Sequence, residues 1–202
     1  MLFVYVKIKI LFVKSVSLQI MVIKYYKLIA DGYSDTGVMY APKEWPRPVA
    51  KDAVPVENWQ SLVLELKDGP YCHYNKIVGS ANVISKELKE LLQSFLNNGD
   101  DYLEFLPVKV VSKEYGDKKY FIMHFKKIFD VIDSDNTVFG PCGRTVHDVI
   151  LLRVLYEKVK DLKVFNFRPL LNDVIVSEDI YKAIIKNKLK KGIDFQPIYC
   201  VK

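Results

Sequence analysis

Five side chains of this 202-residue chain are of the types that ligate zinc: Cys72, His73, His124, Cys142 and His147. Zinc sites usually take their ligands from closely spaced pairs such as CxxC or HxxxH. Here Cys142 and His147 form one loose pair, and the adjacent Cys72 and His73 would point to opposite faces of a strand. The spacing therefore argues against a metal site, and we expect no metal cofactor.

Nucleophilic catalysis is the other chemistry that these residue types suggest. A cysteine hydrolase needs a thiolate beside an imidazole, and none of the three cysteines lies in a recognisable nucleophile motif. Phosphate-binding loops of the GxxxxGK[ST] and GxGxxG types do not occur in the sequence either. We therefore expect no cofactor and no enzymatic activity. A small Cys/His hydrolase is the less favoured alternative.

Side chains suited to binding a protein partner lie in two expected loops. The first loop carries four prolines between Pro42 and Pro55, which excludes a long helix or a central strand. Trp45 lies inside this loop, and Trp59 lies just beyond it. Large aromatic side chains near such a loop either anchor a partner or pin the loop to the core, and pinning is the commoner role.

The second expected loop runs from Phe129 to Arg144 and is acidic at its start. Its aspartates could meet a basic partner surface and speed the encounter, although acids in such a segment are more often a solvated turn. The candidate partner-binding residues of the two loops are Trp45, Trp59, Asp130, Asp133 and Asp135.

The formal net charge of +6 at pH 7 comes from the two ends of the chain. Five lysines precede the first acid, Asp31, and six lysines follow Tyr181 against the single acid Asp194, so the body between them carries −4. The four arginines are scattered, whereas nucleic-acid-binding proteins usually concentrate Arg and Lys on one element. Nucleic-acid binding is therefore an alternative that the charge pattern does not favour.

The elements that must position these residues are clearest from Val83 to Val111. Ser85 can cap a helix, and residues 97–99, Asn-Asn-Gly, tolerate the left-handed conformations that end one. The apolar, β-branched run from Leu103 then predicts a strand. The apolar positions of the helix recur at helical spacing at Leu88, Leu91, Leu92 and Phe95.

The same order of features recurs near the end of the chain. Ser177 corresponds to Ser85 at an offset of 92 residues, and Phe195 corresponds to Phe105 at an offset of 90. The pattern predicts two related helix–strand units in an α+β fold with a mixed, mainly antiparallel sheet. Cap, helix, turn and strand is also a common order, so convergence is the alternative explanation of the similarity.

Other segments have the patterns of strands. Residues 61–66 alternate leucine with other residues before a turn, which predicts a half-buried strand. Residues 108–111 and 120–125 flank a short glycine-containing loop, which predicts a hairpin. Residues 146–155 are too densely apolar for their period to decide, and a strand is favoured over a helix.

Residues 1–20 form an apolar N-terminal extension that Lys7, Lys9 and Lys14 interrupt. They contain no uncharged run of about 18 residues that could span a membrane, and the lysines lie inside the apolar part, unlike those of a signal peptide. The extension is either an added edge strand or a dispensable segment ahead of a start at Met21. We expect a single α+β domain over residues 21–202, with its first strand at Met21.

The cysteine content indicates the compartment. Cys72, Cys142 and Cys200 are odd in number and are not closely paired, which is typical of a reducing environment and not of a disulfide framework. Half of the chain is hydrophobic, which is ample for a packed core. We therefore expect a folded cytoplasmic protein.

Six runs of residues also occur in a recognisable order: Asp68–Asn75, Val83–Leu88, Leu103–Val108, Phe165–Arg168, Ile175–Glu178 and Gly192–Ile198. In this order and spacing they resemble a bacterial immunity-protein family that is encoded beside polymorphic toxins and was long catalogued as a domain of unknown function. The resemblance covers roughly Ile23 to Ile198 and leaves out residues 1–20.

What the resemblance implies is a cytosolic protein that binds a cognate protein toxin encoded nearby and neutralises it by occlusion, without catalysis. It implies no membrane partner, and it names neither the toxin class nor the oligomeric state. The matching runs look structural, so the resemblance identifies no binding residues.

Overall fold

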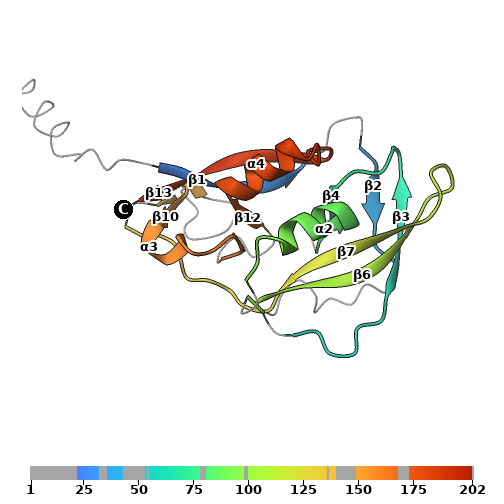
Figure 1. The fold of residues 1–202 in the computed structure, drawn as a ribbon, viewed down its shortest axis with the longest axis horizontal. Helices are drawn as coiled ribbons and strands as arrows, with labels where there is room; N and C mark the ends of the chain where they lie inside the picture. The colour runs from blue at the N-terminus through green and yellow to red at the C-terminus, as the bar shows by residue number, and fades with distance from the viewer. Residues whose placement is uncertain are drawn as a thin grey trace, which may run out of the picture.

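The structure is a computed structural model that describes residues 22–31, 36–42, 53, 55–77, 81–97, 100–135, 137–139, 149–167 and 173–201. Within these residues the strands form two large sheets and one small pair, and three short helices accompany them (Figure 1). The predicted mixture of α and β structure is confirmed, but the strands are divided between two sheets instead of one. The extension over residues 1–20 lies outside the described residues.

Sheet A combines strands from both ends of the described chain. Its members are β1 (Val22–Ala30), β10 (Arg153–Leu155), β11 (Val164–Phe165), β12 (Val174–Ser177) and β13 (Ile193–Val201). The order across the sheet is β10-β13-β1-β12-β11. Strand β1 lies in the centre and is antiparallel to both neighbours, whereas β10 is parallel to β13. The expected first strand near Met21 is confirmed from residue 22 onward.

Sheet B is built from a continuous part of the chain. Its members are β2 (Val38–Tyr40), β3 (Leu62–Lys67), β4 (Tyr74–Ile77), β5 (Ala81–Ser85), β6 (Leu103–Val111) and β7 (Lys118–Phe125). The order across the sheet is β2-β3-β6-β7-β5-β4, and β3 is parallel to β6. The predicted strand at residues 61–66 and the predicted hairpin, now β6–β7, are both confirmed.

Sheet B curls so that its two outer strands approach each other. The side-chain amide of Asn75, on β4, donates a hydrogen bond of 2.7 Å to the backbone oxygen of Gly37, directly before β2. The concave side encloses an apolar cluster that includes Leu64, Val108 and Ile122. The opposite, convex side of β2 and β3 therefore faces outward.

The segment after β7 lies against sheet A. Phe129 forms an isolated bridge with Phe167, and Ile132 forms one with Val154 on β10. Val131, between them, is 2 % exposed within the core of sheet A. Beyond this segment, β8 (Val138–Phe139) pairs with β9 (Val149–Leu151). The single strand expected in residues 146–155 is thus observed as two short strands, β9 and β10, which are interrupted at Leu152 and belong to different sheets.

Helices α2 (Lys86–Gln93) and α4 (Glu178–Lys186) begin directly after Ser85 and Ser177, where the sequence predicts two helix starts. The remaining helix, α3 (Tyr156–Val159), is a single turn. At α2 the Ser85 hydroxyl accepts a hydrogen bond of 3.2 Å from the backbone N–H of Leu88, as expected for an N-cap.

Helix α2 ends earlier than the sequence predicts. Its last residue is Gln93, four residues before Asn97, and Phe95 lies in the turn that follows. The Ser94 hydroxyl donates a hydrogen bond of 2.7 Å to the Leu91 carbonyl, and the backbone N–H of Phe95 bonds to the Leu92 carbonyl three residues back. These bonds satisfy the last carbonyls in a tighter turn, so the helix closes before the asparagines.

The two longer helices meet in the central core. Leu88 and Leu92 of α2 and Ile180 and Ile184 of α4 are fully buried in one apolar cluster. Figure 1 shows α2 lying along β7 and α4 lying along β1 and β13, with both helices near the middle of an elongated molecule. Phe105 and Phe195, the corresponding phenylalanines of the two predicted units, are half-buried at the margin of this cluster.

Polar contacts also join the two sheets. The buried carboxylate of Asp173 pairs with Lys27 of β1 at 2.6 Å and with Lys76 of β4 at 3.0 Å. Gly192, in the turn before β13, has a φ of +84°, and a Cβ added there would lie 2.7 Å from the backbone oxygen of Tyr74. The turn of one sheet therefore packs against the backbone of the other so closely that only glycine fits.

Candidate binding surface

The predicted tryptophan anchors are only partly described. Trp59 is pinned to the core, since its indole N–H donates a hydrogen bond of 2.9 Å to the Pro107 carbonyl and its ring packs against the cluster inside sheet B. Nearby, the backbone N–H of Val56 donates a hydrogen bond of 3.1 Å to the carboxylate of Glu104. The described end of the proline-rich loop therefore packs on sheet B. Trp45 lies outside the described residues.

The three predicted aspartates have different environments. Asp133 is only 6 % exposed, and its backbone joins the edge of sheet A through hydrogen bonds to Arg153 and Thr137. A buried carboxylate cannot steer a partner, so we remove Asp133 from the predicted surface. Asp130 is exposed and pairs with Lys158 at 3.3 Å, and Asp135 is exposed. Sequence reasoning missed the strand-like bridges that draw this segment inward.

The described cysteines have the environment of structural residues. Cys72 is buried, its thiol donates a hydrogen bond of 3.0 Å to the Tyr74 carbonyl, and burial raises its pKa, which disfavours the thiolate. Cys200 is buried in the core of sheet A. Among the described residues, no three His, Cys, Asp or Glu side chains come together as a set of metal ligands. Cys142 and His147 lie outside the described residues.

His73 forms a compact cluster with the start of α2. Its Nδ1 atom lies 2.9 Å from the Ser85 hydroxyl and 4.0 Å from the Glu87 carboxylate. Desolvation lowers the pKa of His73, and backbone and Ser85 hydrogen bonds lower the pKa of Glu87. The Ser85 oxygen already caps the helix, and the serine and the carboxylate approach the same ring nitrogen. A catalytic triad needs opposite ring nitrogens, so the cluster is a cap network.

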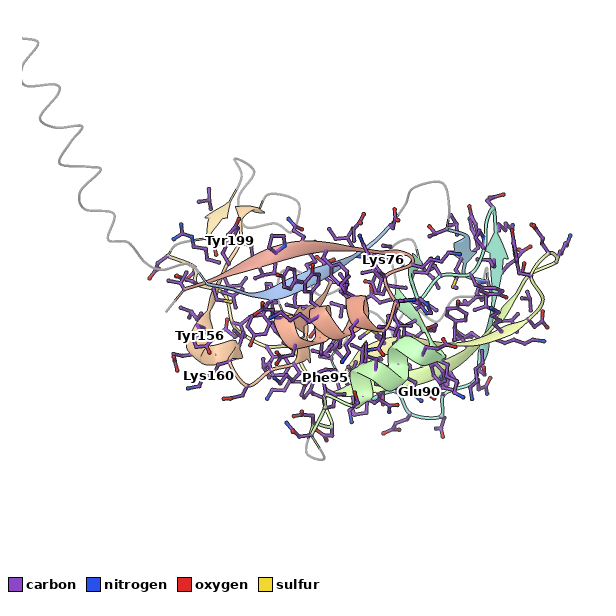
Figure 2. The ribbon with its side chains drawn as sticks, turned by 45° about the horizontal axis from the view of Figure 1, so that its top comes forward. Lys76, Glu90, Phe95, Tyr156, Lys160 and Tyr199 are labelled. Atoms are coloured by element: carbon purple, nitrogen blue, oxygen red, sulfur yellow. The ribbon has the colours of Figure 1, made fainter. Side chains whose placement is uncertain are left out.

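The start of α4 is built differently from the start of α2. Ser177 makes no cap hydrogen bond, and its hydroxyl is buried without a partner among the described residues. Ser177 lines a polar pocket of about 240 Å³ together with Tyr156 and Lys160, at the α3 end of the molecule (Figure 2). Lys160 is paired with Glu157, so this lysine is locally neutralised.

The contrast between the two serines gives a testable prediction. Replacing Ser85 by alanine removes a cap and should lower the free energy of unfolding by about 1 kcal/mol. Replacing Ser177 by alanine should change it by no more than about 0.5 kcal/mol, because no hydrogen bond is lost. Urea unfolding of both variants measures the difference. Equal losses at the two sites would contradict this assignment of the caps.

The largest group of exposed apolar side chains lies on the convex side of sheet B. Seven large hydrophobic residues are exposed in the described part of the chain, and four of them belong to β2, β3 and the β6–β7 turn: Val38, Tyr40, Val63 and Tyr115. We call the outward side chains of β2, β3 and β6 at this end the open face. They are Val38, Tyr40, Val63, Glu65, Lys67 and Lys109.

Charged side chains frame the apolar part of the open face. Lys67 pairs with Glu65 at 3.2 Å, and its ammonium lies 5.0 Å from the centre of the Tyr40 ring. Lys109 pairs with Asp117 at 2.7 Å. Figure 1 shows no helix over β2 and β3, because α2 lies along the other part of the sheet. The open face is therefore an apolar surface with a charged frame.

A groove of about 470 Å³ continues the open face at the β6–β7 turn. The ends of β3 and β6 line it, together with Gly69 and with Tyr115 of the β6–β7 turn. We call it the hairpin groove. The sequence contained a signal for this surface that the predictions did not use, since Val63 is apolar on the outward side of a strand whose inward side is leucine.

No protein-family model matches this chain, and no curated protein shows significant similarity to it. In the described part of the chain, the helices are all too short and too polar to cross a membrane. The fold defines the chain as a mixed α and β protein with two large sheets.

Proposed function

We propose that this protein is an immunity protein that binds a cognate toxin and blocks it by occlusion, without catalysis, in the cytoplasm. The observation that carries the proposal is the open face, an exposed apolar surface on sheet B with charged side chains beside it. Apolar patches with polar rims are typical of protein interaction sites. The resemblance of six sequence runs to immunity proteins supports the same function.

The open face replaces the two loops as the proposed contact surface. Trp59 and Asp133 are committed to the cores of the two sheets, and Asp130 is held in an exposed pair with Lys158. Side chains on strands keep a fixed orientation at little entropic cost, which favours binding. Asp130 and Asp135 stay in the proposal as outlying charges that influence the rate of association.

We also infer that the fold consists of two related helix–strand units in mainly antiparallel sheets. In each sheet, the strand before the helix and the strand after it are separated by one antiparallel strand, β7 in sheet B and β1 in sheet A. The strand after each helix has a parallel outer neighbour, β3 or β10. The strand before each helix has an antiparallel one, β4 or β11.

The correspondence of the units extends to the helix starts. The backbone N–H of Ser85 bonds to the His73 carbonyl, and that of Ser177 bonds to the Lys163 carbonyl, both at 2.9 Å. This arrangement supports duplication over convergence, because it repeats strand order, direction and local bonding together. The function does not depend on it.

The proposed function is tested by co-expression with the toxin encoded by the adjacent gene. Wild-type protein should restore growth of cells that express the active toxin and should co-purify with an inactivated toxin variant. Binding of the toxin should also raise the melting temperature of the immunity protein, since a ligand that binds the native state stabilises it.

The control is the same toxin with an unrelated protein of similar size and charge. Cells that die equally with and without this protein, together with no complex in purification, would refute the proposed function. Slow turnover of the toxin's substrate by the isolated protein would instead favour the hydrolase alternative.

A further inference from the structure

Three exposed apolar side chains lie on the open face beside the charged residues Glu65 and Lys67 of β3. Val63 is 51 % exposed, Tyr40 45 % and Val38 40 %, and the three lie on adjacent, paired strands. Central side chains of this kind usually supply most of the binding energy of an interface, while a surrounding rim excludes water. The chemistry of the rim therefore indicates what kind of partner surface fits.

One margin of the open face is basic. Lys109 and Lys119 lie directly opposite each other on β6 and β7, an arrangement that is unfavourable for like charges. Lys109 is compensated by Asp117, but no described carboxylate pairs with Lys119, whose ammonium lies 5.4 Å from the Phe121 ring. Lys89 of α2 lies 4.2 Å from the same ring. A carboxylate from a partner would compensate this margin.

The other margin, the hairpin groove, is acidic. Tyr115 contributes an aromatic ring, on which a lysine or guanidinium group stacks favourably. Four acids and two lysines line the groove: Glu65, Asp68, Glu114, Asp117, Lys67 and Lys113. Glu65 is paired with Lys67 and Asp117 with Lys109, which leaves Asp68 and Glu114 against Lys113. A small excess of negative charge therefore remains in the groove, opposite in sign to the excess at Lys119.

We propose that the toxin docks on the open face through a surface with an apolar centre, an acidic segment at one margin and a basic side chain at the other. The apolar centre covers Tyr40 and Val63, the acidic segment lies beside Lys119, and the basic side chain enters the hairpin groove beside Tyr115. This inference rests on the proposed function. The polarised rim admits one orientation of the partner and disfavours nucleic acid, whose phosphates would meet the groove carboxylates.

The test measures binding of the full chain to the inactivated product of the adjacent toxin gene. Tyr40→Ala should weaken affinity by roughly thirtyfold or more, mainly through faster dissociation. Lys119→Glu and Glu114→Lys should each slow association by roughly threefold or more at low salt, and the effect should shrink at high salt.

Matched controls lie on α4, away from the open face. Ile185 is 43 % exposed and Lys186 is exposed, so Ile185→Ala and Lys186→Glu repeat the apolar truncation and the charge reversal elsewhere. Both controls should bind the toxin like wild type. Unchanged melting temperatures for all variants would show that any loss of binding comes from the surface itself.

The outcomes separate this inference from the function on which it rests. If wild type protects cells and the variants at Tyr40, Lys119 and Glu114 bind as it does, the docking surface is wrong and the immunity function stands. If wild type neither binds nor protects, both fail. Analytical ultracentrifugation could instead show that the wild-type protein is a dimer and that Tyr40→Ala is a monomer. The open face would then bind a second copy of this chain, and the proposal would be overturned. Retention of single-stranded DNA that Lys119→Glu abolishes would overturn it as well.

Discussion

Replacing Leu92 by alanine is expected to lower the free energy of unfolding by about 2–5 kcal/mol. Leu92 is fully buried at the centre of the molecule, in the cluster that α2 and α4 share. Alanine leaves a cavity between the helices, and the lost contacts add to the lost transfer free energy. Urea denaturation followed by circular dichroism gives the free energy of unfolding of each protein from the midpoint and slope of its transition, and the two values are compared.

Ile185→Ala is the matched control for Leu92→Ala. Both changes shorten an aliphatic side chain on a helix, but Ile185 is 43 % exposed at the surface of α4. Its loss should cost no more than about 0.5 kcal/mol. A loss below about 1 kcal/mol for Leu92→Ala, or similar losses for the two variants, would contradict the packing of α2 against the central core.

Replacing Asp173 by asparagine should produce the second large effect, a loss of about 2 kcal/mol or more in the free energy of unfolding. The carboxylate is largely buried and pairs with Lys27 and Lys76, one from each sheet. Asparagine keeps the shape but leaves two lysines without a counter-charge. Lys76 has 36 % of its side chain exposed and can turn toward water, which keeps the loss below that of a fully buried pair.

The control for Asp173 is the same substitution at an exposed pair. Asp130 has 96 % of its side chain exposed beside Lys158, so Asp130→Asn should change stability by no more than about 0.5 kcal/mol. Thermal unfolding and urea unfolding should both show a larger loss of stability for Asp173→Asn than for Asp130→Asn. If Asp173→Asn lowers the free energy of unfolding by no more than Asp130→Asn does, the ion pairs of Asp173 do not stabilise the contact between the two sheets.

The local features of the fold could be predicted from the sequence because they depend on neighbouring residues. Ser85 and the leucines after it define a helix start and its buried face, and the glycine-containing loop before β7 defines a hairpin. The end of α2 was predicted too late, because Phe95 continues the helical spacing while its backbone already belongs to a tighter turn. The spacing of apolar residues alone does not distinguish another turn of α-helix from the tighter turn that ends it.

The division into two sheets could not be predicted, because it depends on pairing over long sequence distances. The acidic segment around Asp133 reads as a surface loop, yet Ile132 pairs with Val154 and draws it onto sheet A. The same limit applies to the binding surface. Val63 and Tyr115 are far apart in the sequence, and the parallel pairing of β3 with β6 brings Val63 and the β6–β7 turn to the same part of sheet B.

The central position of β1 in sheet A has a consequence for protein synthesis. Sheet B draws all its strands from residues 38–125, so it can form while later residues are still being translated. Strand β1 pairs only with β12 and β13 in the described sheet, and Ala30 must wait for Ile193. At about 5–20 residues per second, this apolar strand stays unpaired for roughly 8–30 seconds. During that interval, charged residues within the strand, such as Lys27, oppose its aggregation.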